Sequence, residues 1–290
     1  MIIFTFYLLM KILVTGGAGF IGSNLCEKLV SEHKVTSLDN YSIGLKENHI
    51  QGIEYIEGDV INISELIKND YDICFHLAGL SRIQPSFDNP FKTFESNTQG
   101  VISVVEWCRT NDTKLIYSGS SSKHYNPYQS PYATFKYLGE EICKMYSKVY
   151  KMNIAITRFY NVYGPKEIVS GQWAAVIGVW RNQVNNGEPI TIVGDGEQRR
   201  DFTHVEDIVK ALISLIKNNN LNIDAWELGT GVNYSINEVA SMFVKKFNSK
   251  VKYIDDQPGN YRETLRKDSI SLENLDWNPE DKLFKYIMSL

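Results

Sequence analysis

The chain has 290 residues, of which 43% are hydrophobic and 22% are charged, so it can bury a sizeable core and is neither disordered nor of low complexity. Its formal net charge is −4, and no run of lysine and arginine exceeds two residues, which argues against a surface that binds nucleic acid or an anionic membrane. The four cysteines are far apart and lack the spacing of metal ligands or of a disulfide framework. We therefore expect no metal site and a reducing, cytoplasmic location.

The chain begins with an apolar segment, MIIFTFYLLM, which is too short to span a bilayer and lacks the features of a secretory signal. A strand that starts at Lys11 would normally lie near a native N-terminus. Residues 1–9 are therefore predicted to be an extension upstream of Met10, with a hydrophobic segment packed on the body as the equal alternative.

Strand-like apolar runs alternate with helical stretches over the first 160 residues. Strands are predicted at 12–15, 35–38, 53–57, 73–77, 114–118 and 155–159, and helices at 20–31, 91–109 and 131–150. This order is typical of an α/β fold, a Rossmann-type doubly wound parallel sheet. Such a sheet binds its ligand at the carboxyl ends of the strands.

The regularity weakens after Gly164. We expect a loop at 167–171, helices at 174–186, 205–217 and 235–247, strands at 189–193 and 226–228, and a short final helix. The predicted organisation is a dinucleotide-binding domain over 10–163 that also takes in about 205–232. A smaller, interleaved C-terminal substrate lobe would hold 164–204 and 233–290.

A glycine-rich turn, TGGAGFIG, follows the first predicted strand and opens the first predicted helix. Glycines at 16, 19 and 22 allow a tight turn, close approach of a pyrophosphate, and helix–strand packing. Asp39 ends the second predicted strand, where its carboxylate can accept hydrogen bonds from an adenosine ribose diol and would repel a 2′-phosphate. No lysine or arginine adjoins Asp39, so NAD is favoured over NADP.

Tyr132 and Lys136 stand four residues apart and therefore on one face of the predicted helix 131–150. An ammonium beside a phenol favours the phenolate, so Lys136 is expected to lower the pKa of Tyr132 and let it act as a general base. The serine run 118–122 lies at the end of the fifth predicted strand and offers a hydroxyl to the same substrate oxygen.

These motifs resemble those of an extended short-chain dehydrogenase/reductase, the NAD-dependent nucleotide-sugar epimerase/dehydratase family. The resemblance runs from about Met10 to the C-terminus and includes HLAG at 76–79, RFYNVYG at 158–164 and GDG at 194–196. It implies that Ser120, Tyr132 and Lys136 are catalytic. The implied NAD-binding residues are Gly16, Gly19, Phe20, Ile21, Gly22, Asp39, Asn40, Asp59, Val60, Leu77, Ala78, Gly79, Asn97, Ser118, Tyr132, Lys136 and Tyr160.

The same resemblance implies a nucleotide-diphosphate sugar, a UDP- or GDP-sugar, as substrate. The implied substrate-binding residues are Ser81, Ser120, Asn161, Ala175, Val176, Thr191, Arg200, Arg262 and Thr264. Arg200 is expected on the diphosphate, and Arg262 is expected to replace a charge that the family carries where this chain has Gln257. Thr264 matches a gate position, where a small residue leaves room for a 2-acetamido group. The two long helices resemble those that build the family's homodimer.

The nearest reaction in the family is 4-epimerisation through a transient 4-keto sugar. A 4,6-dehydratase is disfavoured because Ser121-Ser122 stands where such enzymes carry Asp-Glu. A 3,5-epimerase is disfavoured because the serine run 118–122 contains no cysteine, which such enzymes carry there. Decarboxylation and net oxidation or reduction at C4 stay open. A non-catalytic NAD-binding sensor is disfavoured because Tyr132 and Lys136 are intact. Tyr132 comes only twelve positions after Ser120, and this short loop is expected to turn Lys123 and His124 toward the ligand.

Overall fold

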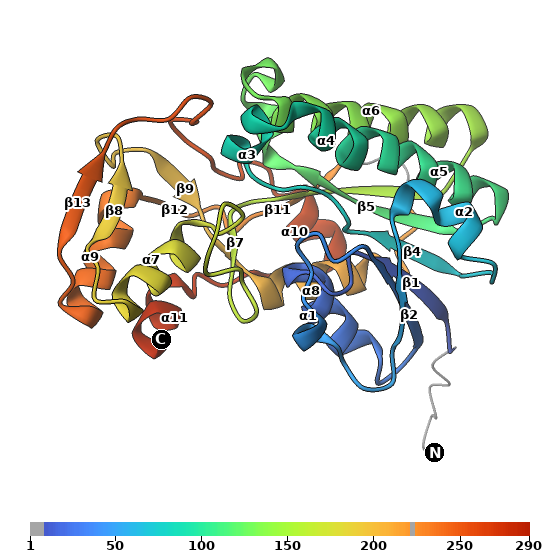
Figure 1. Ribbon diagram of the computed structural model, residues 1–290. Helices are drawn as coiled ribbons and strands as arrows, with labels where there is room; N and C mark the ends of the chain where they lie inside the picture. Colours follow the sequence, from blue (N-terminus) through green and yellow to red (C-terminus); the bar gives the residue numbers. More distant parts are fainter. Residues whose placement is uncertain (1–8, 221–223) are drawn as a thin grey trace.

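The computed structural model describes residues 9–220 and 224–290, and it shows two lobes of unequal size (Figure 1). Apart from Leu9, the extension predicted at 1–9 lies outside the described residues. Leu9 is exposed, and Met10 already packs against the core. No helix in the part of the chain that the structure describes combines the length and apolar content needed to cross a membrane.

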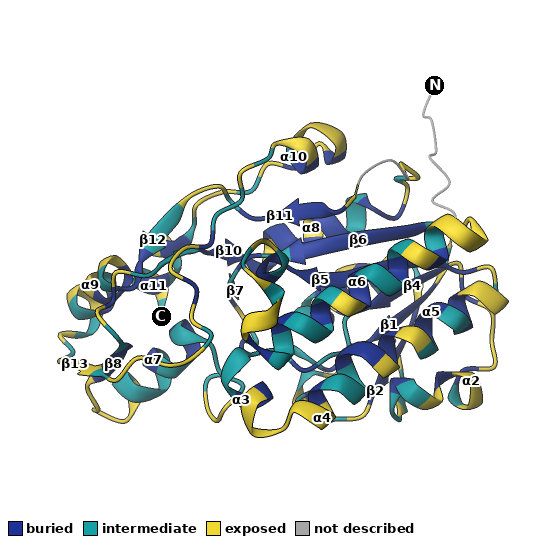
Figure 2. Cartoon of the chain, turned by 90° about the horizontal axis from the view of Figure 1, so that it is seen from above, coloured by how far each residue is buried: buried dark blue, intermediate teal, exposed yellow. Residues whose placement is uncertain are grey.

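The larger lobe is built on one seven-stranded sheet, in the order β11-β6-β5-β4-β1-β2-β3. Every neighbouring pair in this sheet is parallel. The strands are β1 (Lys11–Thr15), β2 (Lys34–Asp39), β3 (Glu54–Glu57), β4 (Ile73–His76), β5 (Lys114–Ser120), β6 (Ile154–Phe159) and β11 (Trp226–Leu228). The inner strands are buried on both faces, as their continuous apolar runs predict, and the Rossmann-type α/β fold is confirmed (Figure 2).

Helices cover both faces of the sheet (Figure 1). One face carries α1 (Phe20–Leu29), α8 (Val205–Ser214) and α10 (Ile270–Leu275), and the other carries α2 (Ile63–Leu66), α4 (Pro90–Phe94), α5 (Gly100–Thr110) and α6 (Pro131–Tyr150). A further helix, α3 (Ile83–Asp88), follows β4 and contacts α6. Short 3-10 turns lie at Lys46–Asn48, Val60–Asn62, Ser121–His124 and Pro127–Gln129.

The helix predicted at 91–109 is interrupted by a π-helical stretch, Glu95–Gln99, between α4 and α5. This stretch carries Asn97, which is fully buried. Its side chain accepts from the Leu80 backbone N–H and donates to the Leu80 carbonyl, each at 2.8 Å. The local widening of the helix therefore holds the loop that leaves β4.

The smaller lobe has its own core, which includes Trp180 and Phe243. Its helices are α7 (Val176–Asn185), α9 (Ile236–Phe247) and α11 (Leu283–Ser289). Its strands pair as β8 (Ile190–Val193) with β13 (Val251–Ile254), and as β9 (Arg199–Asp201) with β12 (Asn233–Ser235). A third pair joins β7 (Val162–Tyr163) to β10 (Thr203–His204) at the junction of the lobes.

The chain passes repeatedly between the lobes. Leu275 and Trp277, which were expected in the smaller lobe, pack in the core beneath the large sheet. The Trp277 indole N–H also donates to the Asp207 carbonyl of α8 at 2.7 Å. Elements of two to six residues, namely α2, α3, α10 and five short strands, were not predicted because they are too short to show a hydrophobic period.

Candidate active site

A cavity of about 770 Å³ lies at the carboxyl ends of the parallel strands and is lined by residues of both lobes. This is the position predicted for the ligand of a doubly wound sheet. The larger lobe contributes the glycine turn, the ends of β2, β4 and β5, and the start of α6. The smaller lobe contributes residues of α7, β8, β9 and the segment near Tyr261.

The glycine turn fits a dinucleotide because side chains are excluded from it. Gly16 has φ +75°, and a Cβ there would lie 2.7 Å from the Ala78 backbone nitrogen. A Cβ on Gly22 would lie 2.1 Å from the Gly16 carbonyl oxygen. Gly16, Gly19 and Gly22 all line the cavity, so a pyrophosphate can approach the N-terminus of α1 closely.

Asp39 stands at the end of β2 and faces the cavity. Its carboxylate accepts hydrogen bonds from the backbone N–H groups of Ala18 at 3.0 Å and Tyr41 at 2.9 Å. Burial is the largest influence on this carboxyl and raises its pKa, while the two N–H groups oppose that rise. The carboxylate is thus fixed at the cavity wall, where a ribose diol can donate to it.

Next to Asp39, Asn40 donates to the Asp59 carboxylate at 2.8 Å. Asp59 in turn caps the turn that begins at Val60. All three residues line the cavity, so the ends of β2 and β3 form one continuous wall. Leu77, Ala78 and Gly79, which follow β4, line the same cavity.

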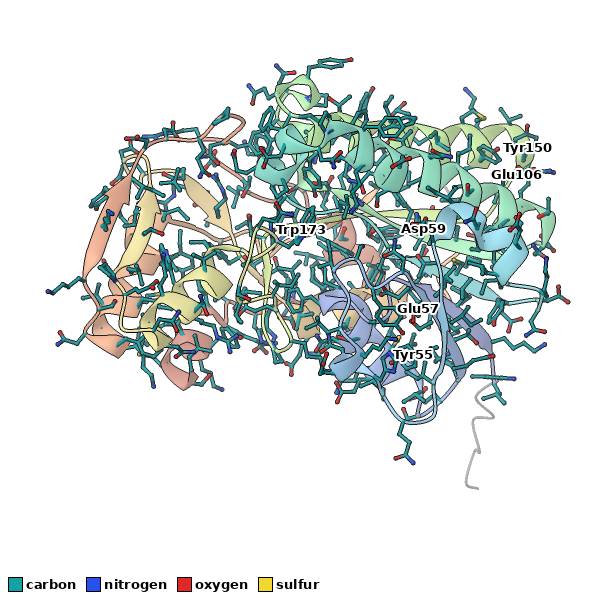
Figure 3. The ribbon with its side chains drawn as sticks, viewed as in Figure 1. Tyr55, Glu57, Asp59, Glu106, Tyr150 and Trp173 are labelled. Atoms are coloured by element: carbon teal, nitrogen blue, oxygen red, sulfur yellow. The ribbon has the colours of Figure 1, made fainter. Side chains whose placement is uncertain are left out.

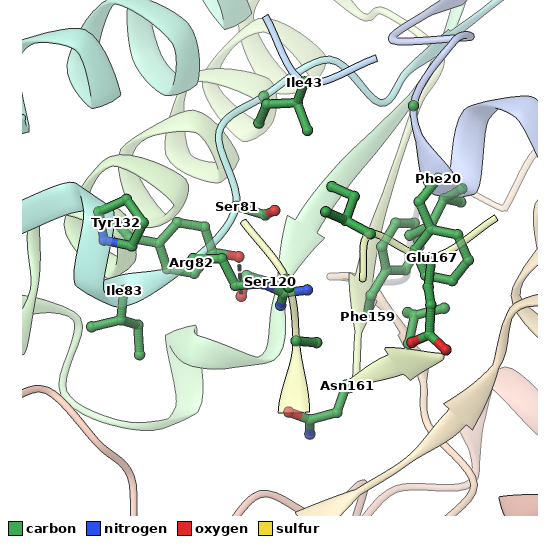
Figure 4. A pocket seen from close by; sticks show the side chains of 18 of the residues that line it. Phe20, Ile43, Ser81, Arg82, Ile83, Ser120, Tyr132, Phe159, Asn161 and Glu167 are labelled. Atoms are coloured by element: carbon green, nitrogen blue, oxygen red, sulfur yellow. Dashed lines mark hydrogen bonds between the residues drawn. The ribbon is translucent and has the colours of Figure 1, made fainter. Parts of the chain in front are cut away.

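Tyr132 and Ser120 lie next to each other in the cavity (Figure 4), and Lys136 also lines it. Ser130 caps α6 by accepting from the Ala133 N–H, which places Tyr132 in the first turn. The Tyr132 hydroxyl lies 3.3 Å from Ser120 Oγ, and Lys136 Nζ donates to the Ser118 carbonyl at 3.0 Å. The phenol and the serine hydroxyl can therefore share one substrate oxygen.

The electrostatics of Tyr132 differ from the expectation. Burial is the largest influence and raises the pKa of its phenol, whereas the Ser120 hydrogen bond and the charge of Arg82 lower it. Lys136 is not among these influences, because its ammonium is directed to the Ser118 carbonyl. Burial also lowers the pKa of Lys136 to about 8. In this structure burial raises the pKa of Tyr132, contrary to the lowering that was predicted from Lys136.

The smaller lobe presents polar groups to the same cavity. Asn161 donates its amide to Thr264 Oγ1 at 2.9 Å and to the Asp201 carbonyl at 3.0 Å. Arg200 donates to the Arg199 carbonyl, and among the described residues no carboxylate lies within ion-pair distance of it. Burial lowers the pKa of Arg200 to about 10. An anion is therefore the missing partner of this guanidinium. Ser81, Ala175, Val176 and Thr191 also line the cavity.

Comparison with known proteins agrees with this geometry. The model of the NAD dependent epimerase/dehydratase family matches residues 12–229. The chain belongs to this family. The putative UDP-glucose 4-epimerase of Methanocaldococcus jannaschii is 33% identical over 93% of each chain.

Solved structures of the family share the fold. Epimerase Mth375 of Methanothermobacter thermautotrophicus has a TM-score of 0.90 at 29% identity, covering 98% of this chain and 92% of its own. The UDP-N-acetylglucosamine 4-epimerase of Methanobrevibacter ruminantium M1, in complex with UDP-N-acetylmuramic acid, has a TM-score of 0.87 at 30% identity, covering 97% and 96%. Curated relatives also include decarboxylases of UDP-sugar acids.

The cofactor of this epimerase/dehydratase chain is NAD. The residues present fit it: the turn at Gly16 and Gly22 excludes any Cβ, and the Asp39 carboxylate at the wall forms no ion pair with any described residue. Gly16, Gly19 and Gly22 would hold the pyrophosphate and Asp39 the adenosine ribose. Lys136 and Ser118 line the cavity beyond them.

Several residues expected at the site of this epimerase/dehydratase chain lie elsewhere. Arg262 is exposed outside the cavity and pairs with Asp195 at 2.9 Å. Asn97 is committed to the Leu80 backbone, and Tyr160 donates to Glu227 at 2.7 Å; neither lines the cavity.

The short loop after β5 also departs from the expectation. Lys123 turns away from the cavity to Asp224 and Glu140, at 3.5 and 3.8 Å. His124 pairs with Glu227 at 2.8 Å. Neither residue lines the cavity, because the carboxylates of Glu140, Asp224 and Glu227 behind β5 attract them.

The organising member of that cluster is Glu140 on α6, which sequence reasoning missed. It accepts from the Ser120 N–H at 3.3 Å and from Arg158 Nη2 at 2.7 Å. Arg158 also donates to Glu227 at 2.7 Å. Glu140 therefore positions the backbone of Ser120 from behind. The signal was its helical spacing, four residues after Lys136.

Two further residues of the cavity wall were missed, Arg82 and Glu167. Arg82 has φ +108° and ψ 137°, a conformation that favours glycine and costs on the order of 1–3 kcal/mol for other residues. Its Nε donates to the Trp173 carbonyl at 3.0 Å, and Trp173 lies between the lobes (Figure 3). Glu167 pairs with Arg181 at 3.0 Å, and its Oε2 has no partner.

Proposed function

We propose that the protein is an NAD-dependent nucleotide-sugar 4-epimerase. The observation that carries this proposal is that Tyr132, Ser120 and Lys136 line one cavity, in which Tyr132 is hydrogen-bonded to Ser120. One wall of this cavity fits a dinucleotide, and the other wall contains Arg200. Arg200 would bind the diphosphate, since a half-buried guanidinium with no carboxylate partner among the described residues favours an anion. The sugar would then lie between Arg200 and Tyr132.

The chain's own residues perform the proton chemistry. Tyr132 removes the proton from the C4 hydroxyl, and Ser120 keeps a hydrogen bond to the same oxygen as it becomes a carbonyl. NAD supplies the acceptor of the C4 hydride and returns that hydride. After the 4-keto sugar has turned over, Tyr132 gives its proton back to the oxygen, and the configuration at C4 is inverted with no net redox change.

The serines after β5 disfavour dehydration. Loss of water across C5 and C6 needs an acid and a base beside the sugar. Ser121 and Ser122 stand at this place, and Ser122 Oγ donates to Ser120 Oγ at 2.9 Å. A serine hydroxyl cannot fill either role near neutral pH. A net C4 dehydrogenase is the second candidate, since the same Tyr132 and Ser120 would serve it.

We further propose a cytoplasmic homodimer and two functional domains. The four cysteines are unpaired and buried, which supports a reducing compartment. Apolar side chains on α5 and α6 are 40–60% exposed, namely Ile102, Leu138, Met145 and Val149, which supports pairing of these helices with a second copy. The NAD-binding domain would comprise 10–163 and 205–232, and the substrate lobe 164–204 and 233–290.

The test is a panel of UDP- and GDP-sugars incubated with the purified protein, with products separated by chromatography and weighed by mass spectrometry. A product of unchanged mass and new retention, formed without accumulation of NADH, is the expected result. Loss of eighteen mass units would replace the proposal with a dehydratase. Loss of two mass units with stoichiometric NADH would replace it with a dehydrogenase.

A further inference from the structure

The cavity holds a second arginine that no carboxylate neutralises. Arg82 lines the cavity, and the only hydrogen bond recorded for it among the described residues runs from Nε to the Trp173 carbonyl. No acidic oxygen of the described chain lies within 4 Å of its guanidinium nitrogens, although every other arginine except Arg200 and Arg266 has such a partner. Its two terminal nitrogens are therefore available to a ligand.

Arg82 lies beside the reacting centre. Figure 4 shows it next to Tyr132 and Ser120, on the segment that follows β4. The positive charge of Arg82 lowers the pKa of the Tyr132 phenol, as expected for neighbouring groups. Arg200, by contrast, belongs to β9 in the smaller lobe. The two unpaired guanidinium groups thus come from opposite walls, and Arg82 is the one beside the atoms that handle C4.

The other charged groups around Arg82 leave it without an internal counterion. Glu167 acts on Arg82 electrostatically but lies beyond ion-pair distance of it. Its Oε1 accepts from Arg181 and from the Tyr286 hydroxyl, each at 3.0 Å, and its Oε2 has no partner among the described residues. Burial disfavours the charge of Arg82, and the positive φ of its backbone is a conformation that glycine would adopt without strain. Neither packing nor backbone geometry explains an arginine at this place.

We propose that Arg82 binds a carboxylate carried by the sugar next to C4, so that the substrate is a nucleotide-activated sugar acid. This inference rests on the proposed function. A planar guanidinium with two free terminal nitrogens matches a carboxylate in a bidentate pair. A neutral sugar would leave a desolvated cation beside a hydroxymethyl group, and a site built for a polar partner rejects the analogue that lacks it.

The experiment compares UDP-glucuronate with UDP-glucose, which differ only by a carboxylate in place of the C6 hydroxymethyl group, together with their C4 epimers. We expect the wild-type kcat/KM to be about 100-fold higher for UDP-glucuronate than for UDP-glucose, because a charge-assisted hydrogen-bonded pair stabilises a complex by about this factor. Arg82→Gly suits the backbone φ of +108° and should lower the ratio of kcat/KM for UDP-glucuronate to that for UDP-glucose by about the same factor. Arg82→Lys keeps the positive charge and should retain part of this ratio. Lys151→Gly is the matched control, since Lys151 is an exposed basic residue with φ +59° at the end of α6.

A second readout separates a sugar contact from a phosphate contact. We expect Arg82→Gly to bind UDP, which carries no sugar, with the calorimetric affinity of the wild type. Weaker UDP binding would show that Arg82 holds the diphosphate and would overturn the inference. An equal loss for acid and neutral sugars, with an alkaline shift of the kcat profile, would show that Arg82 serves only Tyr132 and would also overturn it.

The outcomes for the inference and for the proposed function are distinct. Turnover of UDP-glucose and not of UDP-glucuronate would overturn the inference alone. Loss of carbon dioxide from the acid, with no epimer formed, would support the inference and overturn the 4-epimerase. No product from either pair, with UDP and NAD bound, would overturn the epimerase for these sugars, and unchanged affinity of Arg82→Gly for UDP-glucuronate would then overturn the inference.

Discussion

At the scale of single residues, the account depends on the phenol of Tyr132. Replacing it by phenylalanine removes the proton acceptor and leaves the ring in place. We expect Tyr132→Phe to lower kcat by about 10³-fold with NAD still bound, since a positioned general base contributes about 10²–10⁴-fold. Tyr128→Phe is the control, because Tyr128 is 78% exposed nearby. A kcat within tenfold of wild type for Tyr132→Phe would remove Tyr132 from the mechanism.

Lys136 is expected to lower the free energy of unfolding, although catalysis requires it. Burial lowers its pKa from 10.5 to about 8. Below pH 8 the ammonium is therefore charged in both states, and burying this charge makes the folded state less stable relative to the unfolded state. Each pKa unit corresponds to about 1.36 kcal/mol, so the cost is about 3 kcal/mol at most. It declines as the pH rises from about 8 to 10.5, because the folded state then loses the proton.

Lys136→Met should therefore raise the free energy of unfolding of the NAD-free protein at pH 7 and abolish activity. Chemical denaturation at pH 7 and at pH 10 measures both the gain and its loss. A variant that is less stable than wild type at pH 7 would contradict this prediction.

Site residues could be predicted from the sequence where a local pattern indicates them, and not where their contacts join residues that are far apart in the sequence. The glycine turn, Asp39, Tyr132 and Lys136 were found because strand ends and helical spacing are local properties. Arg262 was misplaced because its partner Asp195 is 67 residues away and no local pattern reports it. Arg82 was missed because its strained backbone appears only in the folded chain.

At the scale of elements, the junction of β1 and α1 is the most constrained part of the site. An added methyl group on Gly22 would lie 2.1 Å from the Gly16 carbonyl oxygen, whereas one on Gly19 would lie 3.2 Å from the same atom. We expect Gly22→Ala to lower the melting temperature and to weaken NAD binding at least tenfold. Gly19→Ala should lower the melting temperature less. Equal melting temperatures for Gly22→Ala and wild type would contradict this packing.

Elements were predicted well where they are long or strongly apolar. The bounds of α6 and β11 agree with the expected 131–150 and 226–228. The π-helical stretch Glu95–Gln99 was not expected, because the helical period of the sequence continues through it. Its cause is tertiary, since Asn97 bonds to the backbone of Leu80.

At the scale of the whole molecule, the exposed apolar face of α5 and α6 predicts the assembly. Met145→Glu should halve the mass measured by light scattering, because it places a charge in the proposed helix bundle. Phe284→Glu is the matched control, since Phe284 is equally exposed, 45%, on α11 of the smaller lobe. A wild-type protein that is monomeric at all concentrations would contradict the homodimer.

The division into lobes explains why the large sheet could be predicted from apolar patterns, whereas Arg82 and Glu167 in the cavity wall could not. Each inner strand of the sheet is buried on both faces, so its sequence carries the apolar signal. The wall formed by Arg82, Glu167, Arg200 and Thr264 joins segments up to 182 residues apart, the span from Arg82 to Thr264. Sequence patterns report neighbours within an element and not such pairings.

The central claim is transient oxidation at C4, and an isotope label tests it most directly. A nucleotide sugar that the protein converts is supplied with deuterium at C4, and product and cofactor are examined by mass spectrometry. The account predicts an epimer that keeps its deuterium at C4, with no labelled NADH released. Loss of the deuterium to water or to free cofactor, with the product still formed, would contradict it.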